Sequence, residues 1–191
     1  MLIYEKFLGE HGPARPFGAF SDTELDVIRK RLPEPIAGFL EKEGRASYAQ
    51  GFFWTTCPTD HDGVLAAWGI KGKQNAIFMR TAFGACLYWN GKQYFYFDPI
   101  VGRVVSLDDD AYLIINYSLR LESILDHGFF RDQYLPLAEL GATLTPSQIL
   151  GFAPAIGAGG SFERSKVDVV DMNVHLHILA QLMGKARRVR L

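Results

Sequence analysis

The sequence predicts an α+β fold in which a mainly antiparallel central sheet packs against N-terminal and C-terminal helices. Three observations predict this class. A helix-start signature opens at Ser21, the pair Asn90-Gly91 separates two strand-like runs, and apolar residues recur at helical spacing over 171–183 before Gly184. Because strands joined by short turns pair in an antiparallel way, we expect a meander at the centre of the sheet.

The N-terminal helices have recognisable starts and ends. Ser21 is followed three residues later by Glu24, a capping-box pattern, and apolar residues then recur at helical spacing as far as Pro33. A second short helix is predicted over 34–43, and Gly44 ends it. Two helices therefore precede the sheet.

The middle of the chain is rich in aromatic and β-branched residues and predicts a series of strands. They are expected at 48–56, near 64–68, and at 75–81, 84–89, 93–97 and 103–107. Asn90 and Gly91 both tolerate the positive φ of a tight reversal, so they predict a hairpin. Asp98-Pro99 predicts a further turn.

Beyond Asp108 the pattern becomes helical. Helices are predicted over 109–121 and 131–140, from Thr145-Pro146 to about Leu150, and over 171–183, with a turn at Gly157–Gly160. The segment at 69–73 predicts a boundary between a lobe of residues 1–72 and a lobe of residues 73–191. The alternative is one continuous compact unit.

Composition predicts a globular protein that has rings available for a partner. The chain has 191 residues, of which 48% are hydrophobic, 21% charged and 13% aromatic. A net charge of −1 hides an acidic body and a basic end made of Lys185, Arg187, Arg188 and Arg190. The acidic body disfavours bulk attraction to nucleic acid and complements a basic protein. We interpret the basic end as a frayed, solvated terminus, with contact to RNA or an anionic membrane as the alternative.

No signal peptide or membrane span is recognisable in the sequence, which predicts a cytoplasmic protein. The two cysteines, Cys57 and Cys86, do not form a CxxC pair, so a secreted disulfide framework is not expected.

Motifs for catalysis are weak throughout. Gly157–Gly160 lacks the GxGxxG spacing of a phosphate-binding loop. His175 and His177 would point away from each other on a helix, so no metal site is expected there. Cys57 and His61 lie around a predicted turn, outside any thiol-hydrolase signature. We therefore expect a binding protein with no enzymatic activity, no cofactor and no small-molecule substrate.

Two groups of carboxylates stand out in the predicted loops. Asp60 and Asp62 share one loop, and Asp108, Asp109 and Asp110 precede a predicted helix. Their ordinary role in such places is solvation and helix capping.

Several segments, in this order along the chain, resemble one family of proteins. They are Leu32-Pro33, Gly44, Tyr48, Gly51-Phe52-Phe53-Trp54, Trp68, Phe83 to Trp89, Tyr94 to Gly102, Leu150 to Gly160, Val170 to His175 and Leu179 to Leu182. The C-terminal segments resemble the immunity proteins of type VI secretion DNase effectors. The N-terminal segments are similar to the GAD-like domain that precedes this part.

The resemblance implies an inhibitor that binds a cognate secreted nuclease toxin inside the producing bacterium. It implies no turnover, no cofactor, no metal, and no direct contact with nucleic acid or membrane. An acidic patch suits a basic DNA-binding cleft, so Asp60, Asp62, Asp108, Asp109 and Asp110 are the candidate toxin contacts. The alternatives are a SUKH-like immunity or scaffold protein against another toxin, and a hydrolase or nucleotide-binding enzyme that uses Gly157–Gly160.

Overall fold

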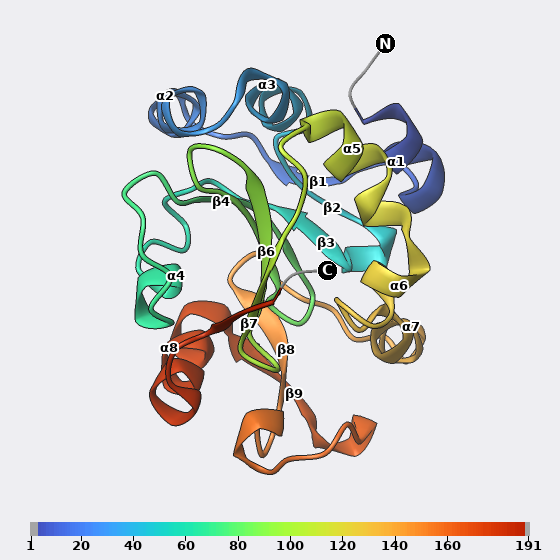
Figure 1. Ribbon diagram of the computed structural model, residues 1–191. Helices are drawn as coiled ribbons and strands as arrows, with labels where there is room; N and C mark the ends of the chain where they lie inside the picture. The colour runs from blue at the N-terminus through green and yellow to red at the C-terminus, as the bar shows by residue number, and fades with distance from the viewer. Residues whose placement is uncertain (1–3, 190–191) are drawn as a thin grey trace.

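The protein is described over residues 4–189 by a computed structural model (Figure 1). Its helices are α1 (Glu5–His11), α2 (Asp22–Arg31), α3 (Glu34–Glu43), α4 (Val64–Ala67), α5 (Ala111–Asn116), α6 (Glu122–Leu125), α7 (Arg131–Glu139) and α8 (Met172–Met183). Short 3-10 turns are η1 (Ala49–Gly51), η2 (Ser118–Arg120), η3 (Ile156–Ala158) and η4 (Arg164–Lys166). Its strands are β1 (Arg15–Gly18), β2 (Arg45–Tyr48), β3 (Phe53–Thr55), β4 (Ala76–Thr81), β5 (Cys86–Trp89), β6 (Tyr94–Asp98), β7 (Arg103–Ser106), β8 (Gln148–Phe152), β9 (Val167–Asp171) and β10 (Arg187–Val189).

The predicted α+β class and the mainly antiparallel sheet are confirmed. The large sheet has the order β1-β2-β3-β4-β5-β6-β7-β10, and β8 and β9 form a second, two-stranded sheet. Neighbours from β1 to β7 pair antiparallel, whereas β10 pairs with β7 in parallel. β3 and β4, which lie on either side of residues 72–73, are direct neighbours. The division into two lobes remains a prediction.

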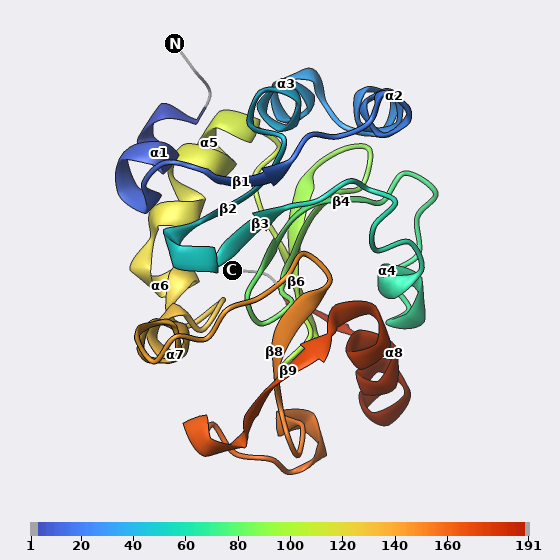
Figure 2. The same cartoon turned by 180° about the vertical axis from the view of Figure 1, so that it is seen from behind.

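Each face of the large sheet is covered by its own set of helices (Figures 1 and 2). Side chains alternate along the strands, so Leu87 belongs to one core cluster while its neighbours Cys86 and Tyr88 belong to the other. The larger cluster packs against α1, α3, α5 and α6. The smaller one packs against α4 and α8.

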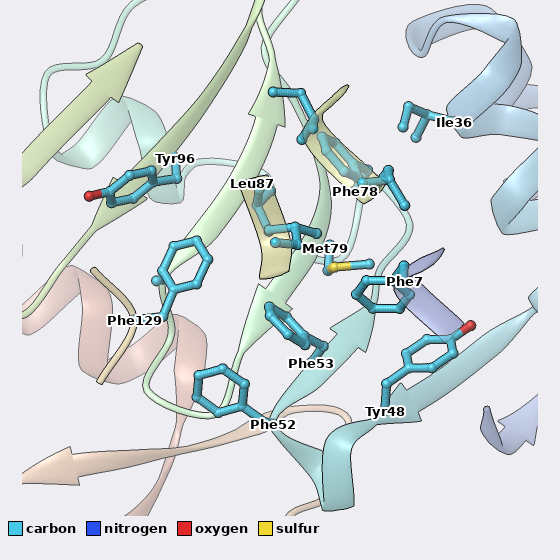
Figure 3. Packing of buried hydrophobic residues seen from close by; sticks show 14 of the residues in the cluster. Phe7, Ile36, Tyr48, Phe52, Phe53, Phe78, Met79, Leu87, Tyr96 and Phe129 are labelled. Carbon is cyan, nitrogen blue, oxygen red and sulfur yellow. The ribbon is translucent and has the colours of Figure 1, made fainter. Parts of the chain in front are cut away.

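The larger core is ring-rich, as the composition predicts (Figure 3). Phe7 on α1 lies 5.1 Å from the ring of Tyr48 and 5.7 Å from that of Phe53. Phe129, beyond α6, reaches the rings of both Phe53 and Tyr96. Edge-to-face packing of this kind joins strands and helices that lie far apart in the sequence.

The best-marked helices fold as predicted. Ser21 and Glu24 form the reciprocal capping box of α2, and α3 spans the predicted residues up to Gly44. At the other end of the chain, the Asp171 side chain accepts from the N–H of Val174 and caps α8. These signals act within one turn of the backbone and do not depend on distant contacts.

The Asn-Gly hairpin is confirmed, with a different role for the asparagine. Trp89 pairs with Tyr94, so four residues form the connection. Gly91 alone in this connection has a positive φ, of 96°. The side chain of Asn90 instead accepts from the N–H groups of Lys92 and Gln93.

Two predicted strands are wrong in extent or in type. The run predicted at 48–56 is a hairpin of β2 and β3, in which Ala49, Gln50 and Gly51 take positive φ and reverse the chain. The run near 64–68 is the helix α4, which follows Gly63 in a left-handed conformation. Such short apolar runs fit a buried helix turn as well as a buried strand.

Two predicted helices also differ from the structure. The segment from Thr145 to Leu150 enters strand β8, which pairs with β9, and the N–H of Leu150 donates to Ala82 O at 2.8 Å. The helix predicted over 109–121 ends as α5 at Asn116 and continues as the 3-10 turn η2.

The described basic residues at the C-terminal end are exposed, as expected, but the segment is a strand and not a frayed terminus. Arg187 and Arg188 are exposed, but both lie on β10 beside β7. The fourth basic residue, Arg190, lies outside the described residues. Across residues 4–189, no helix has the length and apolar character needed to cross a membrane.

Candidate functional site

The loop before α5 presents three carboxylates on the surface. Asp108, Asp109 and Asp110 are all exposed. Asp108 Oδ1 accepts from the N–H groups of Asp110 and Asp109, at 3.1 and 2.7 Å, and these bonds lower the pKa of Asp108. Asp110 Oδ1 accepts from the N–H groups of Tyr112 and Leu113 and caps α5. None of the three forms an ion pair with a described residue.

Three exposed apolar side chains, which we call the apolar row, follow this acidic loop on α5, at its C-terminal cap and after the 3-10 turn η2. Leu113, Tyr117 and Leu121 follow one another at intervals of four residues, with 38%, 42% and 52% of their surface exposed. The opposite side of the same segment is buried, because Ile114, Ile115 and Leu119 pack into the larger core. Scattered apolar residues are ordinary on surfaces, but a row beside unpaired acids is typical of a protein-binding site.

Tyr117 is held in place from α1. The Lys6 ammonium donates to Tyr117 Oη at 2.6 Å, and this bond raises the pKa of Lys6 and lowers the pKa of Tyr117. The ring of Tyr112 lies edge-on to that of Tyr117 at 5.8 Å. Tyr117 is therefore an oriented aromatic side chain on the surface.

A groove runs along the other side of the acidic loop. Its volume is about 380 Å³, and it separates the start of α3 from the hairpin of β5 and β6. Its lining residues are Pro33, Pro35, Trp89, Tyr94, Asp109, Asp110, Ala111 and Tyr112. We call the acidic loop, the apolar row and this groove together the α5 face.

The other two predicted carboxylates have basic partners. Asp60 receives two hydrogen bonds from Arg45, at 2.8 and 2.9 Å, and a third from the N–H of Cys57. Asp62 lies 3.3 Å from Arg31. Asp108 to Asp110 thus lie together without an ion-pair partner among residues 4–189, whereas the other pair lies in a separate, partly neutralised loop.

The residues that the sequence offered for catalysis pack against, or form hydrogen bonds with, other parts of the fold. Cys57 is buried, and its Sγ lies 3.1 Å from Thr59 Oγ1. His61 Nδ1 bonds to Asn173 Oδ1 at 2.9 Å. The Gly157–Gly160 segment overlaps η3. A Cβ on Gly160 would lie 1.9 Å from Pro154 O, so close packing requires a glycine at this position.

The two histidines of α8, His175 and His177, contact different parts of the structure. His177 Nδ1 bonds to the carbonyl of Asn173, and His175 lies against Gly151. Within residues 4–189, no three His, Cys, Asp or Glu side chains are grouped to hold a metal ion.

Sequence reasoning missed two features. The first is the apolar row, although the spacing of Leu113, Tyr117 and Leu121 is visible in the sequence. The second is Arg80, which is fully buried beside Trp54 and donates to the carbonyls of Thr145 and Pro146. Burial lowers the pKa of Arg80 to about 9. No local pattern marks such a residue.

Comparison with known proteins gives one family and one fold. The family model described as the GAD-like domain matches residues 2–98. The crystal structure of Atu4351 from Agrobacterium tumefaciens is similar, with a TM-score of 0.74 and 21% identity. The similarity covers 93% of this chain and 88% of that chain. No curated protein matches. At this identity the similar structure shows the fold alone, and the resemblance of residues 150–184 to the immunity proteins remains a prediction.

Proposed function

Because the chain belongs to the GAD-like domain family, we propose that it is an immunity protein that binds a nuclease toxin and inhibits it without catalysis of its own. In its finer form, the proposal names a DNase delivered by a type VI secretion system. The residues from Leu150 to Gly160 and from Val170 to His175 support this finer form by their resemblance to such immunity proteins.

The observation that carries the proposal is the α5 face. Three carboxylates without basic partners among the described residues lie at the start of an exposed row of Leu113, Tyr117 and Leu121. A nuclease holds the phosphates of DNA with lysine and arginine side chains. Carboxylates on an inhibitor complement the same side chains and so compete with DNA.

The charged and apolar parts of the α5 face would contribute to different steps of binding. The field of Asp108, Asp109 and Asp110 would accelerate the encounter with a basic cleft, mainly at low salt. Exposed apolar and aromatic side chains such as Tyr117 would lose water in the complex and slow its dissociation. Association and dissociation rates therefore report on separate residues.

The first experiment measures binding to a nuclease toxin identified by co-purification with this chain or by inspection of the neighbouring genes. The variant carries Asp108→Asn, Asp109→Asn and Asp110→Asn, because asparagine keeps the capping acceptor and removes only the charge. We expect the association rate at low salt to fall by about 10-fold or more and its salt dependence to flatten. The dissociation rate should change little.

A matched control removes the same charge elsewhere. Asp22→Asn, Asp26→Asn and Glu139→Gln change three exposed acids on α2 and α7, none of which belongs to the α5 face. An equal loss of association rate in both triple variants would mean that only net charge matters and would eliminate the α5 face as the docking site.

The second experiment removes the aromatic contact. Tyr117→Ala should raise the dissociation rate by about 10-fold or more, as expected for a central aromatic contact, and leave the association rate nearly unchanged. Phe162→Ala is the control, because Phe162 has the same 42% exposure and lies far along the chain, before η4. If no nuclease binds the wild-type chain, the function itself is refuted and not only the assignment of the surface.

A further inference from the structure

A row of side chains crosses four neighbouring strands on one face of the large sheet. Arg15 on β1 pairs with Ser47 on β2, and Ser47 pairs with Trp54 on β3. Trp54 in turn pairs with Arg80 on β4. Residues that lie directly opposite one another on paired strands point to the same face of a sheet. The row therefore has an arginine at each end, with a hydroxyl and an indole between them.

A pocket of about 250 Å³ lies over the outer part of this row. Arg15, Ser47 and Trp54 belong to its lining, and the segment 142–146 between α7 and β8 forms another wall (Figure 2). Phe17 of β1 adds an apolar wall, and its ring lies 5.2 Å from that of Trp54. Arg15 is the only charged residue among the described residues that line the pocket. The pocket therefore combines ring surfaces with a positive charge.

Arg80, at the inner end of the row, is a buried cation without an anionic partner. Its side chain is fully buried, and it forms no ion pair within residues 4–189. The pKa of Arg80, about 9, keeps the guanidinium charged at neutral pH. The opposite residue on β5, Cys86, does not compensate this charge, because burial raises the pKa of its thiol to about 12. Buried charges are usually paired, so Arg80 leaves a positive potential beneath the pocket.

Four carbonyl groups that border the pocket already accept hydrogen bonds. Arg80 donates to two of them, in the segment 142–146, at 3.1 and 3.0 Å. The hydroxyl of Tyr134 and the indole N–H of Trp54 donate to the other two, in η1, at 2.7 and 2.6 Å. These acceptors are therefore engaged within the fold.

Two groups of the pocket that remain free can both donate to an anion. The Arg15 guanidinium is exposed and has no ion-pair partner among residues 4–189. The hydroxyl of Ser47, which pairs directly with Arg15, forms no hydrogen bond with another described residue. A guanidinium presents a planar fork of N–H groups that matches a carboxylate through two parallel hydrogen bonds. The pocket therefore suits a ligand with a negatively charged acceptor.

The wall at η1 has a backbone that costs energy to hold. Ala49 and Gln50 have positive φ values of 48° and 59°, which residues other than glycine seldom adopt. Tyr134 holds this turn, because its hydroxyl donates to the Gln50 carbonyl. Conformations of this kind are concentrated at ligand-binding and active sites.

We propose that this pocket binds an aromatic carboxylate, whose carboxylate group is held by Arg15 and Ser47 and whose ring packs against Phe17. Arg80 contributes through its charge and does not touch the ligand. A carboxylate is favoured over a phosphate, because one guanidinium reaches the ligand and a phosphate carries almost twice the charge. The inference does not depend on the proposed function.

Titration of the full chain with benzoate, followed by heteronuclear NMR, tests the proposal. We expect saturable binding with a Kd on the order of 1 mM, as suits a ligand of this size. The amide signals of Ser47 and Gln50 and the indole signal of Trp54 should shift. Benzamide, a neutral counterpart of the same shape, should bind at least about 10-fold more weakly.

Two arginine variants distinguish the pocket from a general effect of charge. Arg15→Gln should weaken benzoate binding by about 10-fold or more and change benzamide binding little. The control is Arg187→Gln, because Arg187 is also exposed and lies on β10, at the opposite edge of the same sheet. Each variant removes one positive charge from an edge strand, and the control should leave the Kd for benzoate unchanged.

Arg80→Met tests the contribution of the buried charge. The variant, once far-UV circular dichroism confirms that it folds, should bind benzoate about 3-fold or more weakly and benzamide as well as the wild-type chain does. Equal weakening of both probes would mean that Arg80 only shapes the pocket. Arg80→Lys keeps the charge and should keep the preference for benzoate.

The same chemistry occurs in a free aromatic acid and at the end of a protein chain that terminates in an aromatic residue. N-acetylphenylalanine represents the chain end, and N-acetylphenylalaninamide is its neutral counterpart. Tighter binding of benzoate would identify a free acid as the ligand, and tighter binding of N-acetylphenylalanine would identify a chain end. Either preference supports a carboxylate pocket.

Three results would overturn the proposal. They are the absence of saturable binding up to about 20 mM benzoate, which lies well above the expected Kd, equal affinities for benzoate and benzamide, and equal weakening by Arg15→Gln and Arg187→Gln.

Discussion

His61 and Asn173 are joined by a hydrogen bond of 2.9 Å across 112 positions of the chain. The Nδ2 of Asn173 donates to Asp60 O, which leaves its Oδ1 as the acceptor for His61. His61 Nδ1 therefore carries the proton, and the buried Nε2 has no hydrogen-bond partner among the described residues. This bond ties the loop before α4 to the N-terminal turn of α8.

The first prediction concerns the pH dependence of stability. Burial lowers the pKa of His61 below its usual 6.5, so the unfolded chain binds this proton more readily. The stabilisation is complete above the unfolded pKa and decreases as the pH falls through about 6.5 towards the folded pKa. In urea titrations from pH 7.5 to 5, His61→Gln should flatten the fall in unfolding free energy by up to about 1.4 kcal/mol per pH unit. A variant with the wild-type pH slope would contradict this role.

The second prediction concerns the buried guanidinium of Arg80. It donates to the carbonyls of Thr145 and Pro146, at 3.1 and 3.0 Å, and lies over the ring of Trp54. Arg80→Met keeps much of the volume but leaves those carbonyls without their donor. We expect a loss of about 2–4 kcal/mol in unfolding free energy.

Hydrogen exchange distinguishes this effect from a general loss of packing. Amides next to the segment of residues 142–147 should exchange faster in Arg80→Met. Amides of the β5–β6 hairpin should keep their protection after correction for the change in the free energy of global unfolding. Uniform loss across the sheet would show that Arg80 does not hold this segment.

The third prediction compares two glycines. A Cβ on Gly160 would lie 1.9 Å from Pro154 O, whereas one on Gly9 in α1 would meet nothing within 4 Å. Gly160→Ala should therefore destabilise the protein by about 1–3 kcal/mol through steric strain. Gly9→Ala should stabilise it by about 0.5–1 kcal/mol, because alanine favours a helix. Chemical denaturation measures both changes, and a Gly160→Ala variant as stable as the wild-type chain would refute the steric account of Gly160.

The fourth prediction concerns thiol reactivity. Cys57 and Cys86 are both free and buried, and burial raises the pKa of Cys86 to about 12. Because the thiolate is the reactive form, native protein should react with a disulfide reagent at least about 100-fold more slowly than unfolded protein. Rapid labelling of either thiol without unfolding would show that this part of the core opens locally.

Local signals in the sequence determined the helices that carry their own starts and ends. The capping box of Ser21 and Glu24, the cap of Asp171 and the hairpin around Gly91 each act within a few residues, so they form as predicted. The aromatic runs at 86–89 and 94–97 likewise predict strands, because aromatic residues favour the β conformation. These features are sufficient to predict the α+β class without any tertiary contact.

Long-range packing decided the features that the sequence left open. The run at Val64 becomes a helix and the run at Ile149 becomes a strand, because each takes the form that fits the partner it packs against. The same is true of the candidate site. Asp60 has Arg45 as a partner from 15 positions away, whereas Asp108 to Asp110 have none among the described residues, and no spacing rule distinguishes the two groups.

The two sides of α8 show most clearly what the periodicity of a sequence cannot determine. In the sequence Leu176 and Ile178 are both apolar residues of one helix, and only the tertiary structure buries the first and exposes the second. Periodicity shows that a helix can be buried but not which side meets the core, since a helix that is apolar on two sides gives the same signal for both. The sequence alone therefore determined where the helices and hairpins form. The tertiary structure decided which of their side chains remain available to a partner.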